Sequence, residues 1–472
     1  MKKIVILVAF VSVMTIFVNE SYGDAIDKKI MAHYMPWYQS QPFRGWWGWH
    51  WHMNHFNPPA TVASHYYPLL GPYDSNDPHI LASQALLMKF AGIDGIIADW
   101  YGIEDFWDYG LIRDATHHFI QYIKKAQLEF SICYEDQTVG YMLDNGHFAN
   151  RAEAVAHGKL VMQWLEDNYF TDPSYLKLDS RPVLLCFGPQ FFTSLEWTSL
   201  FKDLDPKPHF FPLIYHDVPK TGEFDWPAPQ DGTNGVTTHL NTFYNRAASY
   251  GWGYFIGGAF PRFHDIYEQA GVGPSYGYID DQDANTYRET LERGLQSNAN
   301  IVQIVTWNDY GEGTIIEPTQ EDGYLYLEIT QELRKEYVDS NFPYGAADLR
   351  LPVRLYTLRK EHQDNPTVMA QLNMVEDYLF ANNLRGAEKL LDQIECTDLI
   401  TGDIDGDCKV NLYDLAILAS AWLSKAGDDN WDPDCNISQP TDNVINFLDF
   451  SVFADTFFMW RLSETDVEKT QN

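Results

Sequence analysis

Short apolar runs alternate with longer amphipathic segments from residue 28 to about residue 319. Each run is continuously apolar, as a strand buried on both faces requires. We expect strands at residues 30–33, 95–99, 130–134, 183–187, 210–215, 236–240, 254–259 and 301–306. Helical periodicity lies between them at residues 80–90, 111–126, 152–168 and 287–296. About eight strands alternating with helices predict an α/β fold, a (β/α)8 TIM barrel.

A doubly wound open sheet is the competing architecture. No GxGxxG loop follows the first predicted strand, which argues against a dinucleotide-binding version of that sheet. Beyond the barrel, residues 325–337 have the pattern of its last helix. A proline-punctuated connector follows at residues 341–365, and residues 369–394 indicate two amphipathic helices with a turn at Asn382 and Asn383. The chain then changes character and predicts a small all-α module built on calcium loops.

The N-terminus predicts export. Met1-Lys2-Lys3 precedes an apolar stretch at residues 4–18, and small residues at Ser21 and Gly23 suit cleavage after position 23. No later run approaches the roughly 20 apolar residues of a membrane span. We therefore expect a signal peptide at residues 1–23, a barrel domain at 24–340, a connector with short helices at 341–397 and the calcium-loop module at 398–462. The expected location is extracellular or periplasmic.

The charge of the chain narrows the class of partner. The formal net charge is −34, from 66 acidic and 32 basic residues. Nucleic acid is thereby disfavoured, since phosphate binding needs positive charge. Aromatic residues make up 15% of the chain, and their faces either stack on sugar rings or fill a large core. A neutral polysaccharide and calcium remain compatible with this composition.

Polar and aromatic side chains follow the predicted strands at their carboxyl ends, where the active sites of barrels lie. His33, Asp99, Glu135 and His216 each stand at such an end. One acidic strand end carries little information, but several in register indicate a functional cleft. The candidate substrate-binding residues are His33, Tyr34, Trp37, Trp49, His50, Tyr67, Asp99, Trp100, Tyr101, Glu135, His216, Trp307 and Asn308.

The segment GWWGWHWHMNHF at residues 45–56 allows three interpretations. Strand-like alternation would place His50 and His52 on one face with His55 nearby, as in a metal site. No carboxylate or cysteine completes that set, and tryptophans interleave it. A sugar-binding wall with Trp49 and His50 toward the cleft is the favoured alternative, and plain loop packing is the third.

The stretch VTWNDYGEGTIIEP at residues 305–318 carries the candidate catalytic pair. Asp309 and Glu312 come directly after a predicted core strand, and Gly311 and Gly313 permit a tight turn. Glycoside hydrolysis needs two such carboxylates, one as proton donor and one as base or nucleophile. A surface turn without a catalytic role is the alternative, since Asn, Asp and Gly are ordinary turn residues. No catalytic cofactor is expected.

Residues 30–320 resemble glycoside hydrolase families 71 and 99, which are related (β/α)8 enzymes. The resemblance rests on MAHYMPWY (31–38), HYYPLLGPYDSNDP (65–78), AGIDGIIADWYG (91–102) and TWNDYGEGTIIEP (306–318). The HYYP and EGTxIEP elements are similar to family 99, the endo-α-mannosidases and mannanases. Asp309, where family 99 usually has Glu, is similar to family 71, the α-1,3-glucanases.

The resemblance implies two mechanisms. By similarity to family 99, Asp309 would deprotonate the sugar O2 and the product would retain its anomeric configuration. By similarity to family 71, Asp309 and Glu312 would act as a base and acid pair. Both imply that Glu312 donates the proton. The family 99 elements cover more of the chain, which favours retention.

The stretch DIDGDCKVNLYDL at residues 403–415 has the spacing of a calcium loop. A second copy follows, with two extra residues at Pro440 and Thr441, and such paired loop-helix repeats resemble a dockerin type I domain. That resemblance implies docking onto a cohesin-type module, whereas a calcium-stapled cap without a partner is the alternative. The candidate calcium ligands are Asp403, Asp405, Asp407, Lys409 (carbonyl), Asn411, Asp414, Asn436, Ser438, Asp442, Val444, Asn446 and Asp449.

Five cysteines fall into two groups. Cys133 and Cys186 lie in apolar strand-like runs and are expected to be buried thiols. Export permits a disulfide among the other three. Because paired calcium loops pack side by side, we expect a Cys408–Cys435 bond and a free Cys396.

The sequence therefore predicts a secreted, endo-acting glycoside hydrolase that cleaves an α-linked polysaccharide of the mannan or glucan type. A non-catalytic glycan-binding barrel is the first alternative, and a polysaccharide-assembly protein is the second. The signal peptide and the calcium repeats argue against the second alternative.

Overall fold

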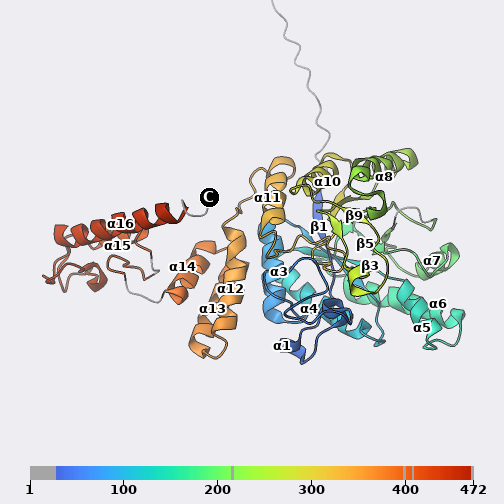
Figure 1. The fold of residues 1–472 in the computed structure, drawn as a ribbon, viewed down its shortest axis with the longest axis horizontal. Helices are drawn as coiled ribbons and strands as arrows, with labels where there is room; N and C mark the ends of the chain where they lie inside the picture. The colour runs from blue at the N-terminus through green and yellow to red at the C-terminus, as the bar shows by residue number, and fades with distance from the viewer. Residues whose placement is uncertain (1–27, 214–216, 397–399, 407–408, 469–472) are drawn as a thin grey trace, which may run out of the picture.

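The computed structural model describes residues 28–213, 217–396, 400–406 and 409–468. The signal peptide predicted at residues 1–23 lies outside this range, as do His216, Asp407 and Cys408. Figure 1 shows a large α/β body joined through a helical segment to a smaller C-terminal tail.

Parallel strands form the centre of the large body. They are β1 (Lys29–Tyr34), β2 (Gly95–Trp100), β3 (Glu129–Tyr134), β5 (Arg181–Cys186), β6 (His209–Pro212), β7 (Ile256–Ala259) and β10 (Ile301–Ile304). Neighbours in this order pair in parallel as far as β6, and β7 pairs with β10, which pairs with β1. Phe224 bridges Leu213 beside β6 and Ile256 of β7, again in parallel. The strands thus close into a ring, consistent with the predicted (β/α)8 barrel.

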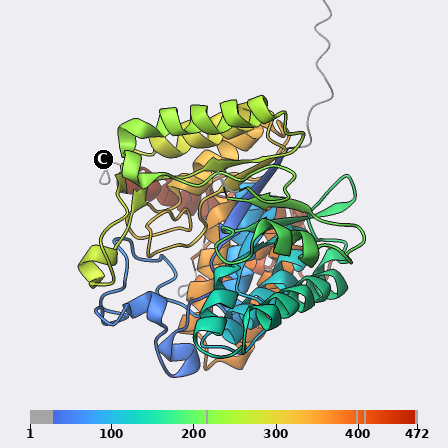
Figure 2. The same cartoon turned by 90° about the vertical axis from the view of Figure 1, so that its right-hand side faces the viewer.

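Helices surround this ring (Figure 2). The large ones are α3 (Pro78–Ala91), α4 (Tyr109–Lys125), α6 (Arg151–Leu165), α8 (Val236–Tyr250), α10 (Asn285–Gln296) and α11 (Leu325–Tyr337). Smaller elements lie in the connecting loops: α1 (Gln41–Arg44), α2 (Trp49–His52), β4 (Lys177–Leu178), α5 (Gln137–Asp144), α7 (Ser194–Leu200), β8 (Phe263–His264), α9 (Tyr267–Ala270) and β9 (Tyr278–Ile279). The predicted helices at 80–90, 111–126, 152–168, 287–296 and 325–337 are all present.

Side chains alternate between the two faces of each strand. Met31, Ile97, Cys133 and Leu185 belong to one apolar cluster, which fills the inside of the barrel. Their neighbours Ala32, Ala98, Tyr134 and Cys186 belong to another cluster, together with the apolar faces of the surrounding helices. Odd-numbered positions of β1, β2 and β3 therefore point into the barrel, and even-numbered positions point toward the helices.

The strand predicted at residues 236–240 is wrong. These residues begin α8, in which Val236, Leu240, Phe243 and Ala247 are the buried positions. That spacing of three or four residues is helical. The sixth position of the ring is held instead by the segment around Phe224.

The segment between the barrel and the tail is largely helical, although its prolines suggest an irregular connector. It contains α12 (Leu351–Glu361), α13 (Pro366–Phe380) and α14 (Leu384–Glu395), and the turn predicted at Asn382 and Asn383 separates the last two. Prolines occupy the first turns of α12 and α13, where a helix tolerates them. Leu355, Leu379 and Leu391 join the core cluster that also contains the outer face of the barrel strands. This segment therefore packs on the barrel.

The tail contains two helices, α15 (Leu412–Ser420) and α16 (Phe447–Glu468). Its small core is a separate cluster that includes Val410, Leu418, Cys435, Ile445 and Phe453. Figure 1 shows it beyond α14, away from the barrel. The all-α character of this segment agrees with the prediction.

The cysteines of the tail differ from the prediction. Cys396 is disulfide-bonded, whereas Cys435 is a buried free thiol. The predicted Cys408–Cys435 bond is therefore wrong, because Cys435 is packed into the tail's apolar core. Cys133 and Cys186 are buried free thiols, as expected.

Candidate active site

A cavity of about 800 Å³ opens at the carboxyl ends of the barrel strands. It brings together residues from β1 and β2 and from the segments that follow β1, β2, β3 and β10. Among the predicted site residues, those lining it are His33, Trp37, Trp49, His50, Asp99, Tyr101, Glu135, Asp309 and Glu312. The cleft expected from the strand ends is therefore present, with both candidate catalytic carboxylates in its wall.

Local hydrogen bonds fix the loop that carries the two acids. The Asp309 N–H donates to the hydroxyl of Thr306 at 2.7 Å, and the Glu312 N–H donates to Asp309 Oδ1 at 3.0 Å. The Gly313 N–H closes the turn onto the Asp309 carbonyl at 3.0 Å. Gly313 has a φ of +68°, and a Cβ there would lie 2.6 Å from the His264 carbonyl oxygen. Glycine is required at this point of the turn.

Asn308 anchors the same loop to the first strand. Its Oδ1 accepts the N–H of Met35 at 2.8 Å, and its Nδ2 donates to the Met35 carbonyl at 3.0 Å. Its amide also donates to the hydroxyl of Tyr73 at 3.0 Å. Asn308 is fully buried and does not line the cavity. Its predicted role as a substrate contact is corrected to that of a positioning residue.

Glu317 lies in the same motif and stabilises the loop that carries Asp309 from the side away from the cavity. Its carboxylate accepts hydrogen bonds from Tyr73 at 2.7 Å, Tyr310 at 2.9 Å and Gln84 at 2.6 Å. Burial raises its pKa to about 7, and these hydrogen bonds oppose that rise. The end of the motif therefore supports the catalytic loop and stays outside the cavity lining.

The environments of Asp309 and Glu312 separate their pKa values. Burial raises the pKa of Asp309 to about 6, and the backbone N–H groups of Glu312 and Gly311 oppose the rise. Burial raises the pKa of Glu312 well above its ordinary value, and the negative charges of Asp309, Asp265 and Glu135 add to the rise. Within the described part of the chain, Glu312 Oε2 is buried without a hydrogen-bond partner. The surroundings therefore favour the protonated form of Glu312, while the backbone N–H groups at Asp309 favour its ionised form.

Glu135 and Asp99 bring further carboxyl groups to the same cavity. Burial, followed by the charges of Asp136 and Asp309, raises the pKa of Glu135 to about 8. Burial, followed by the charges of Glu135 and Asp309, raises the pKa of Asp99 well above its ordinary value. With a pKa of about 8, Glu135 is mostly neutral at pH 7, in which form it donates a hydrogen bond to a bound hydroxyl.

The tryptophan- and histidine-rich segment forms one wall of the cavity. Trp49–His52 is the short helix α2, so the strand-like alternation expected there is wrong. The His50 ring stacks on Trp37 with centroids 4.3 Å apart, and burial lowers the His50 pKa to about 3. Trp49 presents an exposed face to the cavity. His50, His52 and His55 form no metal-ligand group among the described residues.

Four of the predicted substrate contacts lie elsewhere. Tyr34 and Trp100 point outward to the helices, where Tyr34 donates to Gln84 at 2.9 Å and Trp100 stacks on Trp164. Trp307 is fully buried, and the hydroxyl of Tyr67 donates to the Pro59 carbonyl at 3.0 Å. None of the four lines the cavity, which corrects their assignment. His216 lies outside the described residues.

Several lining residues are not predicted by the sequence pattern. Trp226 follows the unrecognised sixth position of the ring, and Tyr267 and Tyr276 come from the long loop after β7. Phe187 follows β5 directly. Strand alternation on β5 predicts an inward Phe187, because Leu185 points inward. The loop tyrosines carry no comparable pattern.

The first predicted calcium loop of the tail gathers three carboxylates. One oxygen from each of Asp403, Asp405 and Asp414 lies within 4.8 Å of the others. Asp414 also accepts the N–H groups of Ile404 at 2.7 Å, Asp405 at 3.1 Å and Asn411 at 2.8 Å. In the described residues no hydrogen-bond donor reaches the buried Oδ1 of Asp405. This donor set, all oxygen, fits a hard cation such as Ca²⁺.

The second loop repeats the arrangement. Asp449 accepts the N–H groups of Ser438 and Asn446, each at 2.9 Å. Asn436 Oδ1 and Ser438 Oγ are buried and lack a hydrogen-bond partner among the residues described. Asp442 accepts the Val444 N–H at 3.1 Å, despite the two extra residues in this loop. The unpartnered oxygens of Asn436 and Ser438 also fit a hard cation. Lys409 of the first loop pairs through its ammonium with Asp392 of α14.

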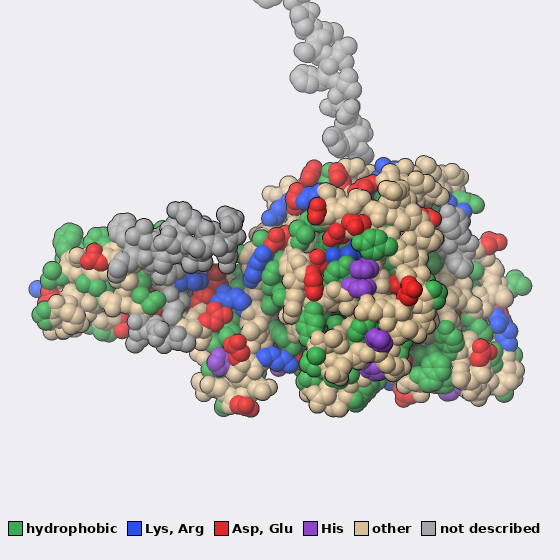
Figure 3. Space-filling view, in the orientation of Figure 1, with side chains coloured by type: hydrophobic (Ala, Val, Ile, Leu, Met, Phe, Trp, Pro, Cys, Tyr) green, Lys and Arg blue, Asp and Glu red, His purple; other side chains and the backbone are tan. Residues whose placement is uncertain are grey.

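An apolar groove runs over the outer face of the tail. It is lined by Leu415, Leu418, Ala419, Trp422, Phe447 and Phe450. Hydrophobic side chains are visible at the surface of the tail in Figure 3. Phe447 and Phe450 are exposed.

Comparisons with known proteins point to one group of enzymes. No family model matches the chain. The glycoprotein endo-alpha-1,2-mannosidase of Rattus norvegicus is 22% identical over 378 residues, which cover 68% of this chain and 78% of that protein. A glycoprotein endo-alpha-1,2-mannosidase-like protein of Mus musculus is 26% identical over 329 residues, covering 60% of this chain and 67% of its own. The expected resemblance to endo-α-mannosidases is confirmed.

A solved structure supports the fold. The GH99 endo-alpha-mannosidase from Bacteroides thetaiotaomicron aligns with a TM-score of 0.53 at 18% identity, covering 67% of this chain and 99% of that one. In the described part of the chain no helix has the length and apolar character needed to cross a bilayer. The relatives are glycoside hydrolases, and this supports the predicted enzyme class of the barrel.

Proposed function

We propose that the chain is an endo-acting glycoside hydrolase that cleaves an α-linked polysaccharide of the mannan or glucan type. Glu312 acts as the proton donor and Asp309 as the base. The observation that carries this proposal is the separation of their pKa values in one cavity. Asp309, with a pKa of about 6, is ionised at neutral pH, while burial and neighbouring charges keep Glu312 protonated. Two carboxyl groups whose pKa values are separated by their surroundings suit the roles of acid and base.

Each acid has the surroundings that its role requires. Glu312 Oε2 has no hydrogen-bond partner among the described residues and lies in the cavity wall, so its proton is available to a glycosidic oxygen. As the bond to the anomeric carbon breaks, that proton passes to the leaving oxygen. Asp309 Oδ1 accepts the backbone N–H of Glu312 at 3.0 Å, which fixes the Asp309 carboxylate relative to the backbone that carries Glu312.

The base role of Asp309 has two chemical forms. In the first form, Asp309 removes the proton of the sugar O2, and O2 attacks the anomeric carbon to give an anhydro-sugar. Water then opens this intermediate, and the product retains its anomeric configuration. Otherwise Asp309 activates water directly, and the product inverts. We favour the first form, because the relatives that the chain resembles over most of the barrel are endo-α-mannosidases.

Aromatic side chains supply the sugar-binding walls. Trp37, Trp49, Tyr101 and Trp226 line the cavity. Their faces offer apolar surface to the C–H faces of sugar rings. The neutral Glu135 offers a hydrogen bond to a hydroxyl group between those walls.

A panel of α-mannans and α-1,3-glucans tests this proposal. The purified chain is expected to release oligosaccharides with new reducing ends from at least one of them, and Glu312→Gln is expected to bind the same polymer without cleaving it. Binding without release of reducing ends by the wild type would contradict the hydrolase and favour a glycan-binding barrel.

For the tail we propose two structural calcium ions and docking onto a cohesin-type module. The carboxylates of Asp403, Asp405 and Asp414 and the unpartnered oxygens of Asn436 and Ser438 support the ions. The apolar groove that includes Trp422, Phe447 and Phe450 supports the docking surface. Calorimetry should find two Ca²⁺ per chain, and Asp449→Ala should remove one. A single ion in the wild type would contradict the second site.

We further propose that the chain is secreted. The predicted signal peptide supports export, as does the disulfide-bonded Cys396, since disulfides persist in oxidising compartments. Expression of the full chain in a bacterial host with an export pathway should yield a mature protein that begins after Gly23. An uncleaved N-terminus in the cytoplasmic fraction would contradict this proposal.

A further inference from the structure

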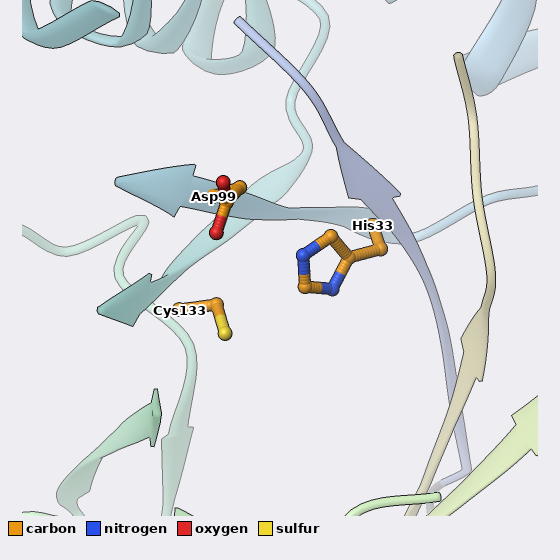
Figure 4. Close-up of side chains that lie close together, drawn as sticks. All are labelled: His33, Asp99 and Cys133. Carbon is orange, nitrogen blue, oxygen red and sulfur yellow. The ribbon is translucent and has the colours of Figure 1, made fainter. Parts of the chain in front are cut away.

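Three side chains with different donor atoms meet inside the barrel, below the cavity (Figure 4). His33 lies on β1, Asp99 on β2 and Cys133 on β3, which are consecutive strands of the ring. Asp99 and Cys133 are direct partners in the register of β2 and β3. One nitrogen, one oxygen and the sulfur all lie within 4.8 Å of one another.

All three side chains are buried. His33 and Cys133 are fully buried, and Asp99 is 2% exposed. Both carboxylate oxygens of Asp99 and the Nε2 atom of His33 lack a hydrogen-bond partner within the described residues. An unpaired carboxylate at such depth is costly unless a proton or a cation compensates its charge.

The hydrogen bonds around His33 leave one of its ring nitrogens available to bind a metal. Its Nδ1 lies 3.1 Å from Gln303 Oε1, and the Gln303 amide nitrogen donates to the Asp225 carbonyl at 3.4 Å. Because the Asp225 carbonyl only accepts, the amide orientation makes Gln303 Oε1 the acceptor of the Nδ1 proton. The lone pair of the neutral ring then lies on Nε2. Histidines that bind metals are oriented by this kind of hydrogen bond from the other ring nitrogen.

We propose that His33 Nε2, a carboxylate oxygen of Asp99 and the Cys133 thiolate bind a divalent cation of the zinc class at the floor of the cavity. Nitrogen, oxygen and sulfur donors together suit Zn²⁺, whereas Ca²⁺ and Mg²⁺ prefer oxygen alone. Bonds of about 2.0–2.3 Å put ligand atoms about 3.3–3.8 Å apart in a tetrahedron, so side-chain rotation must close a gap of about 1 Å. Binding replaces the thiol proton, which passes to solvent.

The fourth coordination position faces the cavity. His33 and Asp99 belong to its lining, whereas Cys133 lies behind them. A water molecule or a sugar hydroxyl would complete the tetrahedron from that side. The site is separate from the proposed hydrolytic pair, and no step assigned to Asp309 or Glu312 passes through the ion.

Cobalt titration of the full-length chain tests the site. Excess Ca²⁺ keeps the oxygen ligands of the tail occupied, and Co²⁺ is added to chain previously stripped of transition metals. We expect one equivalent to give a thiolate-to-cobalt charge-transfer band in the near ultraviolet together with intense visible absorption from tetrahedral Co²⁺. Added Zn²⁺ should abolish both.

Two variants with matched burial locate the thiolate. Cys133→Ala should remove the charge-transfer band. Cys186→Ala should keep it, because Cys186 is an equally buried thiol that faces the helices on neighbouring β5. A band that survives Cys133→Ala, or no band in the wild type, would overturn the proposal.

A second measurement needs no variant. Crystals of the wild-type chain grown with Zn²⁺ should show an anomalous peak at the zinc edge within bonding distance of His33, Asp99 and Cys133. Density for that ion only in the tail or at the molecular surface would refute the site. The measurement does not depend on hydrolysis, so it stands whether or not the proposed function holds.

Discussion

The barrel cleft and the calcium-loop tail both gather carboxylates, and they differ in what surrounds each acid. In the cleft, burial and neighbouring acids raise the pKa of Glu312 well above its ordinary value, and the described residues leave its Oε2 unpartnered. In the tail, Asp414 accepts three backbone N–H groups, and Asp405 forms an ion pair with Lys389 at 3.0 Å. The first environment favours a stored proton, whereas in the second the acids are held by backbone hydrogen bonds and an ion pair.

The two regions also differ in how far along the chain their groups are spread. His33, Asp99, Glu135 and Asp309 meet only because the ring of strands closes. Asp403, Asp405 and Asp414 meet within one loop. We infer that the cleft depends on the whole barrel for its geometry, while the tail depends on a bound ion.

The largest effect expected concerns the stored proton. Glu312→Gln should lower kcat on the polysaccharide by about 10²–10⁴-fold, since the amide cannot donate a proton as the carboxylic acid does. Thermal unfolding should be unchanged or slightly delayed, because a buried acid is replaced by a neutral group of the same shape. Glu388→Gln, on the exposed face of α14, is the matched control and should have wild-type rates. Near-normal turnover in Glu312→Gln would contradict the assignment.

The pH dependence follows from the same pair. Asp309 must be ionised, so kcat/KM should fall about tenfold for each pH unit below its pKa of about 6. Glu312 must be protonated, so the rate should fall again only at pH values well above the ordinary range of a glutamic acid. The profile should therefore be bell-shaped. A profile that stays flat from pH 4 to 6 would remove Asp309 as the base.

The tail should unfold without loss of hydrolysis in the cleft. Asp414→Ala removes a proposed calcium ligand and the acceptor of three backbone N–H groups, and each such hydrogen bond contributes about 0.5–1.5 kcal/mol. Limited proteolysis in calcium should then cut residues 400–460 while the rate of hydrolysis is kept. Asp429→Ala, an exposed acid of the same module, should resist like the wild type. Loss of hydrolysis in Asp414→Ala would show that the two regions are coupled.

The smallest effect concerns the sugar-binding wall. Trp49→Ala should raise KM about 2- to 12-fold and leave kcat nearly unchanged, since an aromatic stacking contact contributes about 0.5–1.5 kcal/mol. Trp107 is more exposed than Trp49 but lies outside the cavity lining. Trp107→Ala should therefore leave both constants unchanged. Equal effects of the two changes would exclude a specific wall at Trp49.

The sequence predicts the barrel well where a strand is a continuous apolar run, and it fails where a strand is not. Around Phe224 the chain reads GEFDW, with two acids beside the pairing residue. Glu223 is buried because Lys220 and Arg246 pair with it, and Asp225 is buried beside His239 at 2.8 Å. Arg246 and His239 lie elsewhere in the sequence, so the local pattern does not mark this segment as a strand.

The candidate site shows the same division. His33, Asp99 and Glu135 were found because polar residues at strand ends converge in a barrel. Tyr34 and Trp100 were included wrongly, although alternation along the strand already places them on the opposite face from His33 and Asp99. Tyr267 and Tyr276 were missed because a long loop brings them to the cavity, and the path of that loop depends on tertiary packing.

The most direct test of the central claim compares two leaving groups. Departure of a strongly acidic phenol needs no proton, whereas departure of a sugar does. We predict that Glu312→Gln retains most of its activity on an activated aryl glycoside of the preferred sugar while losing its activity on the polymer. Asp309→Asn should lose activity on both. Equal loss of both activities in Glu312→Gln would contradict its role as the proton donor.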